Sequence, residues 1–205
     1  MKSLTDNLLN KDQLENVLSK IVIPDCPSMV SEALKEAQKD DPDLRKLSHL
    51  ISENAAMSAA ALKLANSPLF KGRDKISGVK QAVERLGTRI SICIVFEVSL
   101  RATGNGLPPE WLEQFWKRTM QTATVAALIA KKQFGVAPDA AYTYALFHDA
   151  AIPIMMKRFK EYEGILEKAK ENKIMLVEAE NSYFPCTHPV VGSLIVKNWG
   201  LPPLL

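Results

Sequence analysis

Two stretches of the chain carry side chains that could take part in chemistry. The first holds the adjacent pair His148 and Asp149, an imidazole and a carboxylate inside an otherwise apolar run. Both are ligand types for a divalent metal, yet one of each fills only part of the about four to six positions that such an ion requires. The alternative is a pair that hydrogen-bonds within the core, since buried polar groups need partners.

The second stretch is Cys186-Thr187-His188, where Thr187 is placed to cap a new helix. His188 could contact a phosphate or a metal, or it could pack and cap in the first helical turn. Cys186 and His188 could also form a nucleophile and base pair, but residues two apart at a helix start do not naturally face each other. The chain has three cysteines, far apart and without CxxC spacing, which is typical of free thiols in a reducing compartment.

Polar and basic residues also gather near residue 70. Asn66 either lines a ligand groove, together with its neighbours, or caps the end of a helix. A small basic patch follows at Lys71, Arg73 and Lys75, and such patches are usually solvated surface.

Composition narrows the class of protein. The 205 residues are 47% hydrophobic and 24% charged, which predicts one compact domain with an ordinary polar surface. A net charge of +3 counts against nucleic-acid binding. No run of about 18 apolar residues predicts a membrane span, and the N-terminus lacks the apolar segment of a signal peptide. We therefore expect a cytoplasmic location.

The His148-Asp149 pair ends the second of two helices. The first, over residues 110–134, repeats apolar residues at spacings of three and four. Gly135 suits the left-handed position after a helix end, and Pro138 suits the first turn of the next helix. Pro153 then disturbs that second helix, because proline lacks a backbone donor.

The rest of the chain follows the same period, so we predict an all-α, single multi-helix domain over residues 23–205, preceded by an N-terminal helical extension over residues 1–22. Residues 90–100 are β-branched enough for a strand, but their length and the cap at Thr88 favour a buried helix after a stop at Gly87. One charged helix is predicted over residues 157–170. The chain stops on Leu204-Leu205 directly after a helix stop, which predicts a further missing helix.

Several short motifs, taken together and in order, resemble the HDOD domain, a bacterial signalling relative of the HD-type metal-dependent phosphohydrolases. The resemblance covers about residues 23–205. The motifs are Ile23-Pro24-Asp25-Cys26-Pro27, Leu64-Ala65-Asn66-Ser67 with Phe70 and Gly72, Ala82-Val83 with Leu86-Gly87, Phe115-Trp116-Lys117-Arg118, Leu146-Phe147-His148-Asp149, and Thr187-His188-Pro189-Val190-Val191-Gly192 with Trp199-Gly200-Leu201-Pro202.

The resemblance implies an HD-like helical core with an N-terminal helical subdomain, and it also marks departures. HD-type enzymes hold metal with a His, a His-Asp pair and a later Asp. Here Arg118 stands at the first His position, His148-Asp149 is retained, and the later Asp would lie beyond Leu205. The family's Lys after the pair is absent, since Ala150-Ala151-Ile152 follows, and Thr187 replaces the Asp before His188.

These departures imply a non-catalytic signal-transduction or interaction module with a degraded metal site at His148 and Asp149. We then expect no cofactor, and a protein partner or self-association. The alternative is a metal-dependent phosphohydrolase that acts on a nucleotide or cyclic dinucleotide with Mg, Mn or Fe. A DNA-binding regulator, built from the short helices between residues 28 and 86, is a third reading, against which the low charge counts.

Arg118 carries a structural prediction of its own. The resemblance places it where a metal-binding His would project toward the His-Asp pair. A buried carboxylate needs a positive partner or several donors, and a guanidinium offers both. We therefore predict that Arg118 reaches Asp149 directly or through one water.

Overall fold

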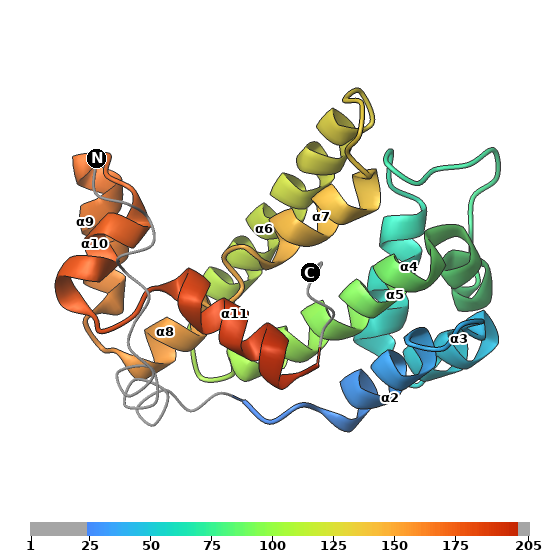
Figure 1. Cartoon of the computed structure of the whole chain (residues 1–205), viewed down its shortest axis with the longest axis horizontal. Coiled ribbons are helices and arrows are strands. Elements are labelled where there is room, and N and C mark those ends of the chain that lie inside the picture. The colour runs from blue at the N-terminus through green and yellow to red at the C-terminus, as the bar shows by residue number, and fades with distance from the viewer. Residues whose placement is uncertain (1–23, 201–205) are drawn as a thin grey trace.

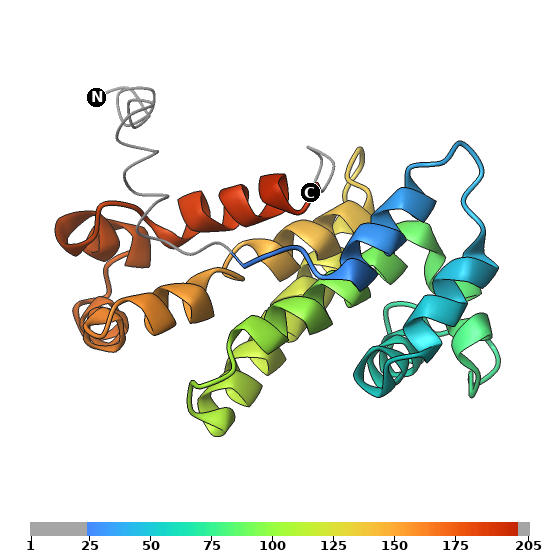
Figure 2. The ribbon, with the colours of Figure 1, turned by 90° about the horizontal axis from the view of Figure 1, so that it is seen from below.

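The computed structural model describes residues 24–200, and these residues form an all-α domain without a strand. The predicted helical extension over residues 1–22 and the apolar end after Gly200 lie outside the described residues. Both views place α9 and α10 at one end and α3 and α4 at the other (Figures 1 and 2). The helices are α2 (Ser28–Ala37), α3 (Leu44–Ser52), α4 (Ala55–Ala65), α5 (Val79–Thr103), α6 (Pro109–Ala130), α7 (Pro138–Phe147), α8 (Ile152–Arg158), α9 (Tyr162–Asn172), α10 (Leu176–Tyr183) and α11 (His188–Asn198).

Helix α5 is the central element, because α2, α3, α4 and α7 all pack against it. Its second half confirms the buried helix that we predicted over residues 90–100, since every residue from Ile90 to Glu97 is buried. Gly87 interrupts the helix with φ 74° and ψ 175°, so the predicted stop is a sharp break inside α5. Gly tolerates this conformation, which side-chain-bearing residues rarely adopt.

Helices α6 and α7 form the predicted hairpin (Figure 1). Gly135 has the expected left-handed backbone, with φ 80°, and Pro138 opens α7. Ala123 and Ala127 are fully buried on α6, so small residues let the two helices approach closely. This packing fixes where α7 ends, and therefore where His148 lies.

The single helix predicted over residues 157–170 is wrong. Helix α8 ends at Arg158, and Phe159 is extended with φ −117° and ψ 112° before α9 begins. The Phe159 ring packs against Phe184, with ring centroids 4.7 Å apart. Burial of this aromatic ring explains the break, since a continued helix would turn its side chain elsewhere.

Helix α11 closes the domain, and Val191, Ile195 and, at its end, Trp199 are buried. The Trp199 indole packs on Phe96 of α5, with centroids 5.2 Å apart. Its Nε1–H donates to the Pro24 carbonyl at 2.8 Å, across 175 positions of sequence. The two ends of the described chain therefore meet on α5.

Candidate functional site

His148 and Asp149 lie in the turn between α7 and α8. Helix α7 ends at Phe147, and Pro153 opens α8. The turn is held by backbone bonds from the Ala150 N–H to the Phe147 carbonyl, at 3.1 Å, and from the Ile152 N–H to the Asp149 carbonyl, at 2.9 Å. Both side chains therefore project from a short, well-bonded corner.

The Asp149 carboxylate pairs with two imidazoles. Its Oδ2 lies 2.9 Å from Nε2 of His148, and its Oδ1 lies 3.2 Å from Nε2 of His188. Nδ1 of His148 is 2.7 Å from the Ala145 carbonyl. The predicted pairing of His148 with Asp149 is thus present, but not in the core, because the His148 side chain is 48% exposed and that of Asp149 is 35% exposed.

His188 is the buried member of the group. It is the first residue of α11 and 5% exposed. Its Nδ1 lies 2.8 Å from each carboxylate oxygen of Glu180 on α10, and its backbone N–H donates to Glu180 Oε2 at 3.1 Å. Glu180 therefore caps α11, and Thr187, which occupies the predicted cap position, makes no side-chain cap bond.

Glu180 has no exposed surface, and Tyr162 is a further hydrogen-bond partner of its carboxylate. The Tyr162 hydroxyl donates to Glu180 Oε1 from the first residue of α9. Four elements thus contribute to one continuous network, which runs from Tyr162 through Glu180, His188 and Asp149 to His148. A buried carboxylate with several donors is adequately compensated for its burial.

The network shifts the pKa values of its members. Burial lowers the pKa of His188, but the bonds to Asp149 and Glu180 outweigh burial and raise it to about 9. Burial would raise the pKa of Asp149, yet the hydrogen bonds and charges of both histidines hold it well below its usual range. The hydrogen bond to Asp149 raises the pKa of His148. Burial and the bond to Glu180 raise the pKa of Tyr162. His188 is therefore an imidazolium at neutral pH.

A divalent metal in this group would compete with the hydrogen bonds that its side chains already make. A metal-binding imidazole offers a nitrogen lone pair, and both nitrogens of His188 face carboxylates instead. Across residues 24–200, no three His, Cys, Asp or Glu side chains are grouped so that they could hold a metal ion. The arrangement is a set of hydrogen bonds and ion pairs that joins α7, α9, α10 and α11.

Two hollows adjoin the network, and His148 and Asp149 line both. One hollow, of about 550 Å³, lies toward α6 and α9 and includes Arg118. The other, of about 1000 Å³, lies between α7, α10 and α11 and is lined mainly by apolar side chains, among them Tyr144 and Met175. These volumes are typical of ligand-binding clefts.

The predicted direct contact between Arg118 and Asp149 is wrong. Arg118 is exposed, and within the described part of the chain its guanidinium makes no ion pair. His148 and His188 instead occupy the two oxygens of Asp149. The imidazoles are attached to rigid helix ends close by, so they pair without ordering a long side chain, which costs more conformational entropy.

Asn66 ties a loop to its helix. Its Nδ2 donates to the Leu62 carbonyl at 2.9 Å and to the Ile76 carbonyl at 2.8 Å, and its Oδ1 accepts from the Ile76 N–H at 2.9 Å. These bonds use its amide fully, as the capping interpretation requires. The basic patch on this loop at Lys71, Arg73 and Lys75 is exposed.

Cys186 does not pair with His188. The thiol is buried, and burial raises its pKa to about 11, which is the opposite of what a nucleophile needs. The imidazole of His188 is directed at Glu180 and Asp149 instead.

Sequence reasoning missed Glu180 and Tyr162. Both lie on stretches that read as ordinary amphipathic surface helices, and a Glu in such a helix is normally solvated. Glu180 lies near the end of α10, only eight residues before His188, and the turn between the two helices brings them together.

No helix within residues 24–200 has the length and apolar character that crossing a membrane requires.

Comparison with known proteins gives a consistent result. The family model of the HDOD domain matches residues 23–205. A solved HDOD domain protein of unknown function from Geobacter sulfurreducens is 26% identical, with a TM-score of 0.69, and the match covers 93% of this chain and 65% of that one. An uncharacterized protein of Treponema pallidum (strain Nichols) is 25% identical over 182 residues, which are 88% of this chain and 35% of that protein.

Further solved structures share the fold. A proposed phosphohydrolase from Shewanella amazonensis SB2B has a TM-score of 0.70 at 21% identity, over 93% of this chain and 68% of that one. A proposed signal-transduction protein from Marinobacter aquaeolei VT8 has a TM-score of 0.68 at 16% identity, over 93% of this chain and 47% of that one. This chain spans about a third of the Treponema protein and 65% of the Geobacter protein.

Proposed function

Because the chain belongs to the HDOD domain family, we propose that it is a non-catalytic signal-transduction module whose HD-type metal site has become an ion-pair network. The observation that carries this proposal is the position of His188. Its imidazolium lies between Asp149 and Glu180, with one nitrogen on each. Metal binding through Nε2 would require this cation to lose a proton and its contact with Asp149, while Nδ1 keeps its bond to Glu180.

Two further observations support the proposal. Arg118 lines the hollow beside Asp149, and a guanidinium there repels a divalent cation. The Marinobacter relative of the same fold is described as a proposed signal-transduction protein. The Shewanella relative is described as a proposed phosphohydrolase, so hydrolysis is the rival that an experiment must address.

The module acts, on this proposal, through contact with a protein and within the cytoplasm. Tyr144 and Met175 are 53% and 67% exposed at the larger hollow, and exposed apolar surface next to a built polar network usually marks a contact. Sedimentation velocity of the wild type and of Met175→Glu separates self-association, which the substitution would weaken, from a monomer that binds another protein.

The decisive test combines metal analysis with an activity assay. Purified protein is incubated with Mg²⁺, Mn²⁺ or Fe²⁺, and bound metal is measured together with hydrolysis of a nucleotide, a cyclic dinucleotide and a simple phosphodiester. We expect neither stoichiometric metal nor turnover. Metal-dependent turnover that is lost in Asp149→Ala, but retained in the distant exposed variant Asp74→Ala, would establish the phosphohydrolase instead.

A further inference from the structure

A separate hollow of about 760 Å³ lies between the end of α4, the end of α5 and the middle of α6. It shares no lining residue with the two hollows beside His148 and Asp149. Leu64 and Met120 contribute apolar wall, and Gln121 contributes an amide. Its size is that of a small-molecule site, which typically holds a few convergent polar groups in an apolar cavity.

The charge of this hollow is predominantly positive. Lys63, Arg101 and Lys117 line it from three different helices, and Glu113 is the carboxylate among its lining residues. Lys63 and Lys117 are exposed, so their long side chains are free to bend over the opening. A cavity lined by more positive than negative side chains attracts an anion.

Arg101 is the fixed member of the three. Its Nη2 donates to Glu97 Oε1 at 2.5 Å, and its guanidinium carbon lies 5.5 Å from the ring centroid of buried Trp116. Glu97 is 2% exposed, and its burial raises its pKa, which Arg101 opposes. The buried carboxylate thus orients the guanidinium in the wall of the hollow.

Polar atoms in this wall lack partners. The Nε of Arg101 and the hydroxyl of Ser67 are buried and make no hydrogen bond within residues 24–200, and no bond is made there by Nη1 of Arg101. Folded proteins rarely leave buried polar atoms unpaired, and a missing ligand is one accepted cause. The Arg101 side chain is 40% exposed, so part of its guanidinium is open to the hollow while Nη2 stays on Glu97.

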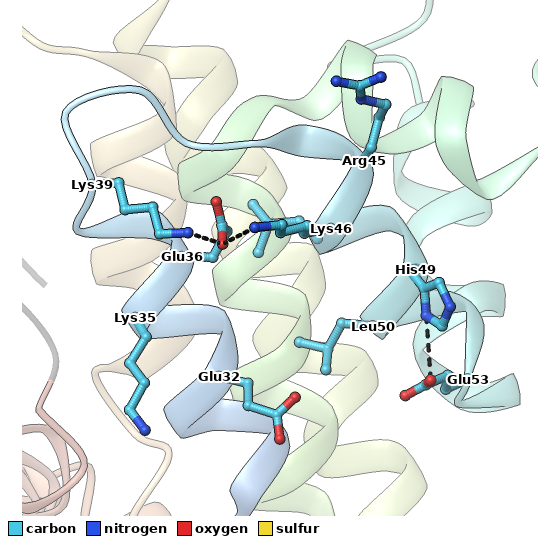
Figure 3. A pocket seen from close by; sticks show the side chains of 10 residues that line it. Glu32, Lys35, Glu36, Lys39, Arg45, Lys46, His49, Leu50 and Glu53 are labelled. Carbon is cyan, nitrogen blue, oxygen red and sulfur yellow. Dashed lines mark hydrogen bonds and ion pairs between the residues drawn. The ribbon is translucent and has the colours of Figure 1, made fainter.

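The hollow between α2 and α3 provides a contrast, because several of its charged groups pair with one another. Figure 3 shows Lys39 and Lys46 both directed at Glu36, at 2.5 Å and 3.8 Å, while His49 pairs with Glu53 at 3.2 Å. The side chains of Glu32 and Lys35 also line this hollow and make no ion pair or hydrogen bond within residues 24–200. The charged groups of the α4–α5–α6 hollow have fewer partners within the protein.

We propose that the hollow between α4, α5 and α6 binds a small molecule that carries a phosphate or carboxylate group, with Arg101, Lys63 and Lys117 around the oxyanion and the Ser67 hydroxyl donating to it. The planar fork of a guanidinium can bond two oxygens of either a phosphate or a carboxylate. The domain then has a ligand site of its own, independent of whether the His-Asp pair binds metal.

Nuclear magnetic resonance titration tests this proposal on the intact chain. The protein is titrated with potassium phosphate, and separately with potassium acetate, against potassium chloride at matched ionic strength. Expected are saturable shifts of backbone amides near Ser67, Arg101 and Lys117 with one or both oxyanions but not with chloride. The stronger of the two responses identifies the oxyanion.

Two variants and a matched control sharpen the result. Lys117→Gln and Ser67→Ala should each weaken oxyanion binding about tenfold, which corresponds to the loss of one charge-assisted hydrogen bond. Ser67→Ala removes a hydroxyl without a partner, so the fold should be kept. Lys132→Gln removes an equal charge at an exposed position that does not line the hollow and should leave binding unchanged.

Three results would each overturn the proposal. The first is a set of shifts that follows ionic strength alone. The second is a set centred away from α4, α5 and α6. The third is an equal effect of Lys132→Gln and Lys117→Gln, which would indicate general surface charge.

Discussion

At the scale of single residues, His188 has the most demanding position in the molecule. It carries its positive charge between two carboxylates, one of which, Glu180, has no exposed surface. Removing one partner of a buried pair costs far more than the pair contributes, because the remaining charge is left without compensation. His148, whose side chain is half exposed, has no such role.

His188→Ala should therefore reduce the free energy of unfolding by about 3–5 kcal/mol, the usual cost of a buried charge left unpaired. His148→Ala should cost about 1 kcal/mol or less, as expected of an exposed pair. Urea unfolding followed by circular dichroism measures both. Equal losses in the two variants would show that Glu180 does not depend on the imidazole.

The same residue predicts a pH dependence. The pKa of His188 in the folded protein, about 9, lies above its ordinary value of 6.5. Its stabilisation is therefore fully present below about pH 6.5 and is lost as pH rises through about 9, with a total of about 3 kcal/mol. Comparison of wild type and His188→Gln at pH 6.5 and pH 9 measures this, and a stability difference that is the same at both pH values would contradict it.

At the scale of elements, the break in α5 depends on one residue. Gly87 has a positive φ, and a Cβ added there would meet no atom within 4 Å. A substitution is therefore penalised by backbone conformation rather than by a clash. Helix α9 contains Gly164, which likewise has free space but an ordinary backbone.

Gly87→Ala should destabilise the domain by about 1–3 kcal/mol, the cost of a strained backbone conformation. Gly164→Ala should stabilise it by about 0.5–1 kcal/mol, because alanine loses less conformational freedom in a helix. Thermal unfolding of the two variants beside the wild type tests the contrast. Two changes of the same sign would rule out the conformational explanation.

The elements also show what sequence reasoning can reach. The helical spacing of apolar residues predicted the main helices, and Gly87, Gly135 and Pro138 predicted where helices stop or start. Local chemistry determines such boundaries. The break at Phe159 was missed because it depends on Phe184, which lies far along the chain. The same distinction holds for the candidate site. A local motif identified His148-Asp149, whereas the contacts of Glu180 and of His188, the second partner of Asp149, depend on tertiary packing.

At the scale of the whole molecule, Trp199 joins the two ends of the described chain. Trp199→Phe keeps an aromatic ring against Phe96 but removes the bond to the Pro24 carbonyl, so it should cost about 0.5–1.5 kcal/mol. Trp111→Phe is the control, because Trp111 stacks on Phe115 and makes no hydrogen bond through its indole in residues 24–200. If the urea midpoints of Trp199→Phe and Trp111→Phe fall by the same amount, the loss comes from aromatic packing and not from the hydrogen bond to Pro24.

Two of the hollows are lined by adjacent residues of helix α6. Lys117 lines the oxyanion hollow, and its neighbour Arg118 lines the hollow beside His148 and Asp149. If a ligand held by Lys117 shifts α6 as a whole, Arg118 moves with it, and occupancy of one hollow then alters the affinity of the other. Thermodynamic linkage makes any such allosteric effect reciprocal: whatever binds beside Asp149 would change the affinity for the oxyanion by the same factor.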